Sequence, residues 1–276
     1  MFDAHAHVNS SDFKLDTDEV INRARQKSVT MVNVGYQLST SQRAVALSEK
    51  YDICYSSVGL QPFHVMDREI EERVDKHETI KIKTRAETFD YEKYKALALS
   101  SKKVVAIGEC GLDYHYSDKE NLPEERKLQI EVFNAQIDLA NELDLPMIIH
   151  CRDAHDDLIA ILKKNPLKNP SEAHFFSGNW QQAKQLIEMS HYIGFTGTIT
   201  FKNKIEDTIE ILKNMPEDKI ISETDCPYVS PVPFRGKRNE PAYLEYIVNK
   251  IAEVRGLTLK ESEKVTVDNA KRLFKL

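Results

Sequence analysis

The sequence predicts an α/β fold, a (β/α)₈ barrel that forms a single domain over residues 1–276. Short runs rich in β-branched and aromatic residues alternate with longer stretches of helical periodicity, as expected of strand–helix–strand units in a parallel sheet. There are eight such runs, and the chain has the length typical of a closed barrel of this type. The predicted strands are Phe2–Val8, Val29–Val34, Ile53–Gly59, Val104–Gly108, Pro146–His150, Ala173–Phe176, Tyr192–Phe195 and Lys219–Thr224.

The stretches between these runs carry apolar residues at every third or fourth position, which places them on one face of a helix. Glu124–Leu143 and Pro241–Arg255 show this spacing, and Gly256 is placed to end the second of these helices. Acidic residues from Asp16 onward favour the start of a further helix, which we expect to end near Lys27. Helices therefore follow the strands in the order that the barrel requires.

The segment 65–103 is the least typical part of the predicted barrel. It contains the charged runs DREIEERVDKHE and KIKTRAE. Charges of both signs are common on helices that face solvent. We therefore expect one or two surface helices here, near the mouth of the barrel.

Composition excludes several classes of protein. The chain has 38 basic and 44 acidic residues, a net charge of −6, and an acidic balance that argues mildly against a protein that coats DNA or RNA. No apolar run approaches the roughly 18 residues that span a bilayer, and the start MFDAHAHV does not resemble a signal peptide. The four cysteines contain no CxxC pair, which disfavours a disulfide framework or zinc ribbon. We therefore expect a reduced, cytoplasmic protein that does not enter a membrane.

Two histidines in the first predicted strand are the first sign of a functional site. Side chains alternate along a strand, so Asp3, His5 and His7 share one face. Barrel strands are usually apolar on both faces, so these histidines need polar partners. A metal ion would supply them, since imidazole nitrogen is a good ligand for zinc and similar cations. A hydrogen-bonded histidine pair without metal is the alternative.

Polar residues recur at the carboxyl ends of other predicted strands, namely Glu109, His150, His174 and Asp225. In a barrel these ends converge on one face, where active sites lie. With the first-strand pair they offer ligands for two divalent cations. The predicted metal ligands are His5, His7, Glu109, His150, His174 and Asp225. Such sites accept Zn²⁺, Mn²⁺, Mg²⁺ or Fe²⁺, so the sequence does not identify the metal.

Two cations a few ångströms apart acidify a water and polarise the bond under attack. Asp225 could accept the water's proton, which makes it the candidate general base. Glu223 is two residues earlier and shares its face, so it either orients a ligand or is a buried carboxylate with an arginine partner. Cys110, Cys151 and Cys226 each directly follow a predicted ligand and therefore face away from the site. The reaction predicted is metal-assisted hydrolysis of a phosphoester or an amide.

Matching segments along the whole chain resemble the TatD family of metal-dependent deoxyribonucleases. These segments are HAH at 5–7, GLQP at 59–62, GECGLDYH at 108–115, PMIIHCRDA at 146–154, HFFSG at 174–178, ETDCPY at 223–228, RNEP at 238–241 and DNAKRLF at 268–274. The resemblance implies a TIM barrel, the six ligands named above, Glu109 as the carboxylate shared by both metals in the catalytic centre, and hydrolysis of DNA in the 3′-to-5′ direction. The sequence departs from the family pattern at Gln61, where histidine is usual, and at Phe175, where cysteine is commoner. Gln61 and the nearby His64 are candidate substrate contacts.

Other candidate substrate contacts are less specific. Arg152 follows His150 by two residues and could share its inward face. Arg238 lies in the matching RNEP segment, where it either contacts phosphate or forms an ion pair with Glu240 or Glu223. Asp113 lies in the matching GLD segment, and we expect it to orient a ligand. Arg235 and Lys237 are expected in a solvated basic loop.

Two enzymatic functions fit these residues. The first is a deoxyribonuclease that acts on DNA ends, expected to be single-stranded, with no obligate protein partner. The second is an amide or ester hydrolase on the same barrel, such as a deacylase of D-aminoacyl-tRNA. A two-metal site suits both, whereas the intact ligand set argues against a barrel without enzymatic activity. Two bound divalent cations would make the site positive despite the acidic chain. A small site at the opening of the barrel that binds a few nucleotides is therefore compatible with the acidic composition.

Overall fold

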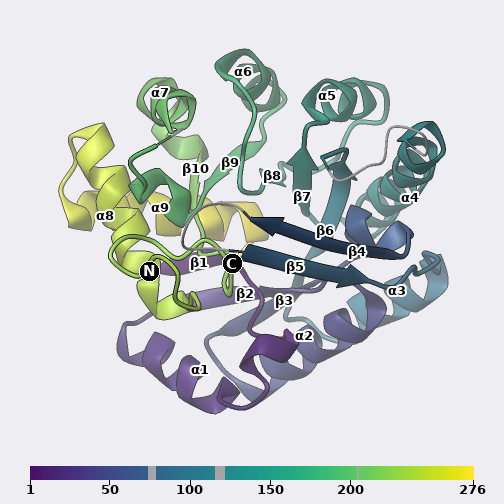
Figure 1. The fold of residues 1–276 in the computed structure, drawn as a ribbon, viewed down its shortest axis with the longest axis horizontal. Helices are drawn as coiled ribbons and strands as arrows, with labels where there is room; N and C mark the ends of the chain where they lie inside the picture. The colour runs from purple at the N-terminus through teal and green to yellow at the C-terminus, as the bar shows by residue number, and fades with distance from the viewer. Residues whose placement is uncertain (74–78, 116–121, 204) are drawn as a thin grey trace.

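The computed structural model describes residues 1–73, 79–115, 122–203 and 205–276, with the side chains of 70–83 left aside. Within these residues, eight parallel strands form a nearly closed barrel in the order β1-β2-β3-β6-β7-β8-β9-β10 (Figure 1). The strands are β1 (Phe2–Ala6), β2 (Thr30–Val34), β3 (Cys54–Val58), β6 (Val104–Asp113), β7 (Met147–Arg152), β8 (Glu172–Ala173), β9 (Tyr192–Phe195) and β10 (Ile220–Ser222). The predicted barrel fold is confirmed, and each predicted strand has a counterpart.

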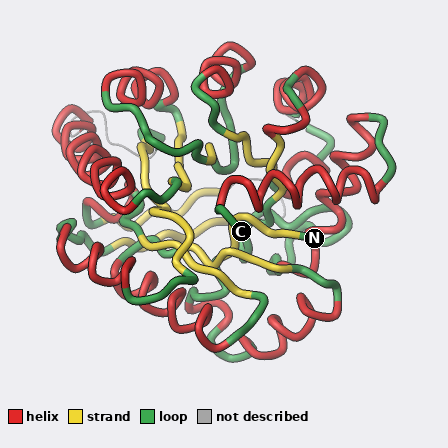
Figure 2. Tube along the Cα trace, turned by 180° about the vertical axis from the view of Figure 1, so that it is seen from behind, coloured by secondary structure: helices red, strands yellow, loops and turns green. Residues whose placement is uncertain are grey.

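Helices surround the strands on the outside, as Figure 2 shows from behind. They are α1 (Thr17–Gln26), α2 (Leu38–Lys50), α3 (Tyr91–Leu99), α4 (Leu122–Leu143), α5 (His155–Lys164), α6 (Trp180–Glu188), α7 (Glu206–Asn214), α8 (Leu244–Arg255) and α9 (Leu259–Phe274). Gly256 ends α8 with a φ of 68°, a conformation that glycine adopts without strain. In the part of the chain that is described, no helix is both long and apolar enough to cross a membrane.

The barrel is closed where β1 meets the chain just after β10. The backbone amide of Asp225 donates to the carbonyl of His5 at 2.8 Å, and the amide of His7 donates to the carbonyl of Cys226 at 2.9 Å. These bonds form one parallel bridge, between Ala6 and Cys226. The seam therefore brings Asp225 next to His5 and His7, more than 200 residues away in sequence, through backbone contacts alone.

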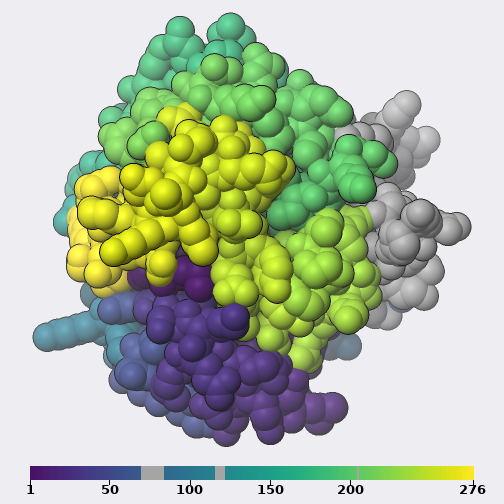
Figure 3. Space-filling model, turned by 90° about the vertical axis from the view of Figure 1, so that its left-hand side faces the viewer, coloured from purple at the N-terminus to yellow at the C-terminus, as the bar shows by residue number. Residues whose placement is uncertain are grey.

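The two ends of the chain pack together beneath the barrel. Figure 3 shows the yellow C-terminal helices against the purple N-terminal segment. The Phe2 and Phe274 rings stack with centroids 5.9 Å apart, and the amino group of Met1 donates to Glu263 at 2.8 Å. Phe2 and Phe274 are both buried, so α9 seals the end of the barrel opposite the carboxyl ends of the strands.

The prediction of helices over 65–103 is wrong for much of this segment. Residues Arg68–Arg73 (β4) and Thr79–Thr84 (β5) form an antiparallel hairpin, and only Tyr91–Leu99 (α3) is helical. In the hairpin register Glu69 is opposite Lys83 and Arg68 is opposite Thr84. The TIKIKT run alternates with a period of two, which is the spacing of a strand and not of a helix. The charge content of this segment favours surface helices, but the period of two in its sequence is what the structure follows.

The hairpin is fixed to the barrel where it starts and where it ends. Arg68 forms an ion pair with Glu125 of α4. The hydroxyl of Thr84 donates to the carbonyl of Met66 at 2.7 Å. Figure 1 shows the hairpin crossing in front of the strands.

Candidate metal centre

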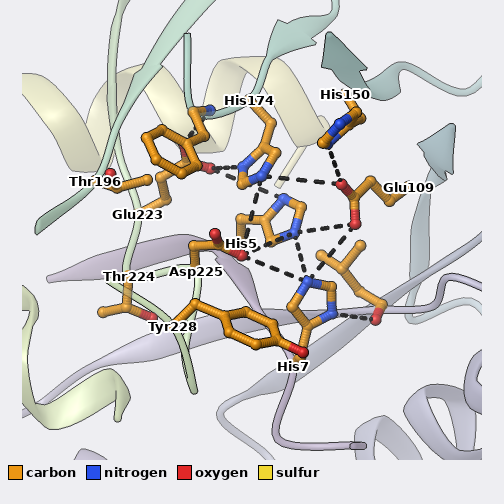
Figure 4. A network of polar contacts seen from close by, with 12 residues as sticks. His5, His7, Glu109, His150, His174, Thr196, Glu223, Thr224, Asp225 and Tyr228 are labelled. Atoms are coloured by element: carbon orange, nitrogen blue, oxygen red, sulfur yellow. Dashed lines mark hydrogen bonds and ion pairs between the residues drawn. The ribbon is translucent and has the colours of Figure 1, made fainter. Parts of the chain in front are cut away.

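The six predicted ligands lie together at the carboxyl ends of the barrel strands (Figure 4). His5 is in β1, Glu109 is in β6, and His150 is in β7. His7 and His174 directly follow β1 and β8, and Asp225 is the third residue after β10. Their nitrogen and oxygen atoms form three overlapping groups whose members lie within 4.8 Å of one another. The groups are His5, His174 and Asp225; His5, His7 and Glu109; and Glu109, His150 and His174.

Glu109 lies at the centre of this arrangement. Its Oε2 is 3.7 Å from Nε2 of His5 and 3.6 Å from Nε2 of His7. Its Oε1 is 2.9 Å from Nδ1 of His150 and 3.9 Å from Nε2 of His174. Each carboxylate oxygen thus faces a different pair of imidazoles, the arrangement expected of a carboxylate shared by two cations.

Asp225 closes the site from the other side. Its Oδ1 is 3.8 Å from Nε2 of His5, 3.5 Å from Nε2 of His7 and 3.9 Å from Nε2 of His174. The backbone of Asp225 has a φ of 54°, in the left-handed region that non-glycine residues rarely adopt. Strained residues of this kind concentrate at functional sites, and the seam bond to His5 holds this one in place.

Protonation states at the centre follow from burial and close contacts. Burial lowers the pKa of His5 well below its usual value. Burial opposes ionisation of Glu109, but the hydrogen bond with His150 and the neighbouring imidazoles outweigh it and lower the pKa of Glu109 to about 2. Neutral imidazole and ionised carboxylate are the forms that bind metal.

His150 behaves differently. Burial favours its neutral form, but hydrogen bonds with Asp113 and Glu109 outweigh burial and raise the pKa of His150 to about 10. A cation that binds here must therefore displace a proton from this ring, because metal and proton compete for the same nitrogen.

Other groups hold three of the four imidazoles in place. Oδ2 of Asp113 is 2.7 Å from Nε2 of His150, and Oε2 of Glu223 is 2.7 Å from Nδ1 of His174. Nδ1 of His7 is 2.9 Å from the carbonyl of Val34. Such contacts fix the ring orientation and are common partners of metal-binding histidines.

The predicted ligand contacts of Asp113 and Glu223 are thus present. Among the described residues, Glu223 contacts His174 and also accepts from the amide of Phe175 at 2.6 Å, so the alternative of an arginine partner is wrong. The reason is topological, since β10 runs beside β9 and faces the loop that follows β8.

A layer of buried carboxyl groups lies beneath the centre, and the sequence analysis missed one of them. Asp3 accepts from the amide of Thr224 at 2.8 Å and from its hydroxyl at 2.6 Å, and burial raises the pKa of Asp3 to about 7. Glu172 is fully buried beside Glu223. Gly194 leaves room for this pair, because a Cβ there would lie 2.5 Å from Oε1 of Glu223. The signal in the sequence was a glutamate two residues before His174, on the same strand face.

Gln61 and His64 lie at the mouth of the site. Nε2 of Gln61 is 3.5 Å from Oε1 of Glu109, so this amide occupies the edge of the centre. The His64 ring stacks on Tyr36 with centroids 5.4 Å apart, and Tyr36 in turn meets His7 edge-on at 5.5 Å. Burial lowers the pKa of His64 to about 4, so this ring is neutral at neutral pH. Their contact with substrate stays a prediction.

The two candidate arginines occupy different places. Arg152 ends β7, where it is half-buried and opposite Asp113 in the strand register. Arg238 lies over the ring of Phe13 and donates to Asp16 with Nη1 at 2.9 Å. The predicted ion pair of Arg238 with Glu240 or Glu223 is wrong.

The ion-pair partner of Glu240 is Arg23 and not Arg238, since Nη2 of Arg23 lies 2.6 Å from Oε2 of Glu240. The loop after β10 folds over the start of α1, which brings Asp16 to Arg238. A role of Arg152 or Arg238 in substrate binding stays a prediction.

The cysteines are packing residues, as predicted. All four are free and buried, and burial raises the pKa of Cys110, Cys151 and Cys226 well above the usual value. A neutral buried thiol is a poor nucleophile and a poor metal ligand. Imidazoles and carboxylates therefore supply the donor atoms of this centre.

Tyr228 was not singled out from the sequence. Its ring lies beside His7 and Asp225 in Figure 4, and the side chain is 44% exposed. Its amide donates to the carbonyl of Asp225 at 2.9 Å, which fixes its distance from the centre. The signal was its position at the end of the matching ETDCPY segment.

The barrel and this donor set define a metal-dependent hydrolase. The model of the family described as TatD related DNase matches residues 2–275, and the chain belongs to that family. The recognised family and the predicted class of enzyme, a metal-dependent hydrolase that acts on ester bonds, are confirmed.

Curated relatives match this chain over its full length. The chain is 40% identical over 278 residues to an uncharacterized metal-dependent hydrolase, YabD, of Bacillus subtilis, covering 100% of this chain and 99% of the relative. It is 34% identical over 285 residues to the 3′-5′ ssDNA/RNA exonuclease TatD of Erwinia tasmaniensis, covering 100% of both chains.

Solved structures agree on the fold. The TatD homologue YJJV of Escherichia coli superposes with a TM-score of 0.86 at 28% identity, covering 100% of this chain and 98% of that one. A TatD family hydrolase of Entamoeba histolytica has a TM-score of 0.78 at 20% identity, covering 99% of this chain and 97% of that one. At that lower identity the likeness concerns the fold alone.

Proposed function

We propose that this protein is a divalent-metal-dependent deoxyribonuclease that removes nucleotides from the 3′ ends of single-stranded DNA. The observation that carries the proposal is the position of Glu109, whose two oxygens face two separate pairs of imidazoles. Membership of the TatD related DNase family and the exonuclease name of the Erwinia relative support the choice of a phosphodiester over an amide.

The side chains at the centre fit two divalent cations. One group of donors consists of His5, His7 and Glu109, and a second consists of Glu109, His150 and His174. Asp225 belongs to a third group with His5 and His174, so it stands between the other two. Nitrogen and oxygen donors of this kind suit zinc, manganese and iron, whereas magnesium prefers oxygen.

Each residue has a distinct task in phosphodiester hydrolysis. Cations bound here would lower the pKa of a water and neutralise charge on the phosphate. Asp225 would accept the proton of the attacking water, because its side chain is 10% exposed, against 4% for Glu109 and none for Glu223. Gln61 is placed to donate its amide hydrogens to a phosphate oxygen at the mouth. Asp113 and Glu223 hold His150 and His174 in position.

The test is a nuclease assay on a 5′-labelled single-stranded oligonucleotide with added Mg²⁺ or Mn²⁺. We expect a ladder that shortens from the 3′ end, stops with chelator and is blocked by a 3′-terminal phosphorothioate linkage. Asp225→Asn should lose at least a hundredfold in rate. Asp52→Asn, an exposed carboxylate paired with Arg25, is the matched control and should retain wild-type activity.

Two results would overturn the proposal. One is full nuclease activity in a correctly folded Asp225→Asn protein. The other is absence of hydrolysis with every divalent metal while D-aminoacyl-tRNA is deacylated by the same preparation. The second result would assign the site to amide or ester hydrolysis.

A further inference from the structure

A large groove opens beside the candidate metal centre. Its volume is about 1530 Å³, which exceeds the roughly 300–1,000 Å³ typical of sites for small molecules. Its walls come from the loops after β7, β8, β9 and β10, and include Phe175, Ser177, Thr198, Phe201, Val232 and Arg235. A monomeric substrate would leave most of this space unused, so the groove suits an extended ligand.

Phe175 connects the groove with the centre. It directly follows His174, and the two rings meet with centroids 6.0 Å apart. The amide of Phe175 donates to Oε1 of Glu223, whose other oxygen contacts His174. One carboxyl group thus holds both a predicted metal ligand and the first residue of the groove wall.

The backbone of Phe175 is held in an unfavourable conformation. Its φ is 42°, in the left-handed region that bulky residues avoid. Such a conformation persists only where surrounding contacts enforce it, and it is frequent where a protein clamps a ligand. The bond to Glu223 supplies that enforcement and directs the ring into the groove wall.

Further along the wall, Phe201 and Arg235 form a combined aromatic and cationic surface. The guanidinium carbon of Arg235 lies 3.6 Å from the centroid of the Phe201 ring. Proteins that bind single-stranded nucleic acid pair such features, because rings stack on unpaired bases and cations contact the phosphates. Base pairs in a duplex do not expose their faces to such rings.

Two acidic residues of the groove have partners of their own. Asp157 forms an ion pair with Arg126 at 2.6 Å, and Asp153 is 2.7 Å from Nδ1 of His115. Burial lowers the pKa of His155 to about 4, so this ring adds no charge at neutral pH. The basic residues that line the groove are Arg126, Lys202 and Arg235, and Arg235 is the one that lies on the Phe201 ring.

We propose that this groove binds the single-stranded nucleic acid that leads to the scissile phosphate. Bases stack on Phe175 and Phe201, and Arg235 contacts a backbone phosphate. The inference rests on the proposed nuclease function and extends it, because it makes a strand of several nucleotides a better substrate than a dinucleotide.

The test compares a long and a minimal substrate in the metal-loaded enzyme. Binding is measured by fluorescence anisotropy with a labelled phosphorothioate decathymidylate, which resists hydrolysis, and kcat/KM is measured for decathymidylate and for the dithymidine phosphodiester. Phe201→Ala and Arg235→Gln should each weaken decathymidylate binding and lower kcat/KM for it by roughly tenfold. Cleavage of the dinucleotide should fall clearly less than cleavage of decathymidylate, because a dinucleotide is too short to fill the groove.

Further variants distinguish stacking from loss of structure. Phe201→Trp keeps an aromatic ring and should restore binding. Leu99→Ala, at an exposed apolar residue that ends α3, and Arg25→Gln, at an exposed arginine of α1, are matched controls and should bind as the wild type does.

The groove proposal is overturned if Phe201→Ala and Arg235→Gln bind decathymidylate as tightly as the wild type, or if they lower cleavage of both substrates equally. Failure of the nuclease proposal would look different. In that case neither substrate is cleaved, while decathymidylate binding and its dependence on Phe201 can still be measured.

Discussion

Oε2 of Glu223 lies 2.7 Å from Nδ1 of His174, and this contact determines which nitrogen of the imidazole faces the candidate metal centre. Nε2 of His174 is left to point toward Glu109 and Asp225. A glutamate without any place in the ligand set therefore controls the geometry of a residue that has one.

Glu223→Gln should weaken metal binding without removing a ligand. An amide replaces one of two oxygens that contact Nδ1 of His174 and the amide of Phe175, so one of these bonds is lost. Affinity for Zn²⁺ or Mn²⁺ should fall roughly 10- to 100-fold, as measured by competition with a chromophoric chelator. Unchanged affinity in a folded Glu223→Gln protein would contradict this role, and Glu217→Gln, at the surface, is the control.

Glu109→Gln and His150→Gln should differ in the metal content that remains. Glu109 belongs to two of the donor groups, whereas His150 belongs to one. The wild type should bind about two ions per chain, as two-metal hydrolases do. His150→Gln should retain about one, and Glu109→Gln fewer than one, because its carboxylate serves both positions. Elemental analysis after dialysis against metal gives the ratio, and equal metal content in the two variants would argue against a shared carboxylate.

His191 should make the fold sensitive to acid. It is 4% exposed, Nδ1 accepts from the amide of Ser171 at 3.1 Å, and burial lowers the pKa of His191 from its ordinary 6.5 to about 4. As pH falls from 6.5 toward 4, the unfolded chain takes up a proton that the folded chain excludes. The stabilisation is therefore complete above pH 6.5 and is lost below it.

The size of this effect on stability follows from the lowering of the pKa of His191. Between pH 7.5 and 5, His191 should lower the free energy of unfolding by about 2 kcal/mol. Urea unfolding at both pH values measures the change, and His191→Asn should show a smaller loss than the wild type. Identical pH dependence in the two proteins would show that His191 is not responsible.

Gln136 should stabilise the chain where β3 ends. Its Oε1 accepts from the amide of Leu60 at 2.8 Å and its Nε2 donates to the carbonyl of the same residue at 2.9 Å. All of these groups are buried, so Gln136→Leu leaves two backbone groups without partners. The free energy of unfolding should fall by about 2–4 kcal/mol, measured by urea unfolding. Gln181→Leu, exposed on α6, should change it by less than about 0.5 kcal/mol.

Most of the barrel could be predicted because its strands are marked locally. The boundaries of β9 were predicted to the residue, whereas β6 runs on to Asp113, past the predicted end at Gly108. Glycine occupies positions 108 and 111 of this strand, and a Cβ at Gly111 would lie 2.0 Å from the carbonyl oxygen of His150. These glycines allow β6 and β7 to approach closely, which only the packed structure reveals.

The hairpin at β4–β5 shows the opposite error. Its residues are as charged as those of a surface helix, so composition alone predicts a helix there. The alternation in TIKIKT was the more reliable signal, because a side-chain period of two is set by the strand backbone itself.

The sequence by itself determined the order of the eight barrel strands, the six candidate ligands and the family. Each of these depends on local spacing or on matching segments, and both can be recognised without knowing the fold. Only the tertiary structure decided that Arg238 meets Asp16, that Arg23 meets Glu240, and that Glu172 and Glu223 lie side by side beneath His174. The partners in each of these pairs are tens to hundreds of residues apart along the chain. Closure of the barrel brings the partners of each pair together. The local sequence around one partner does not predict which distant side chain it will contact.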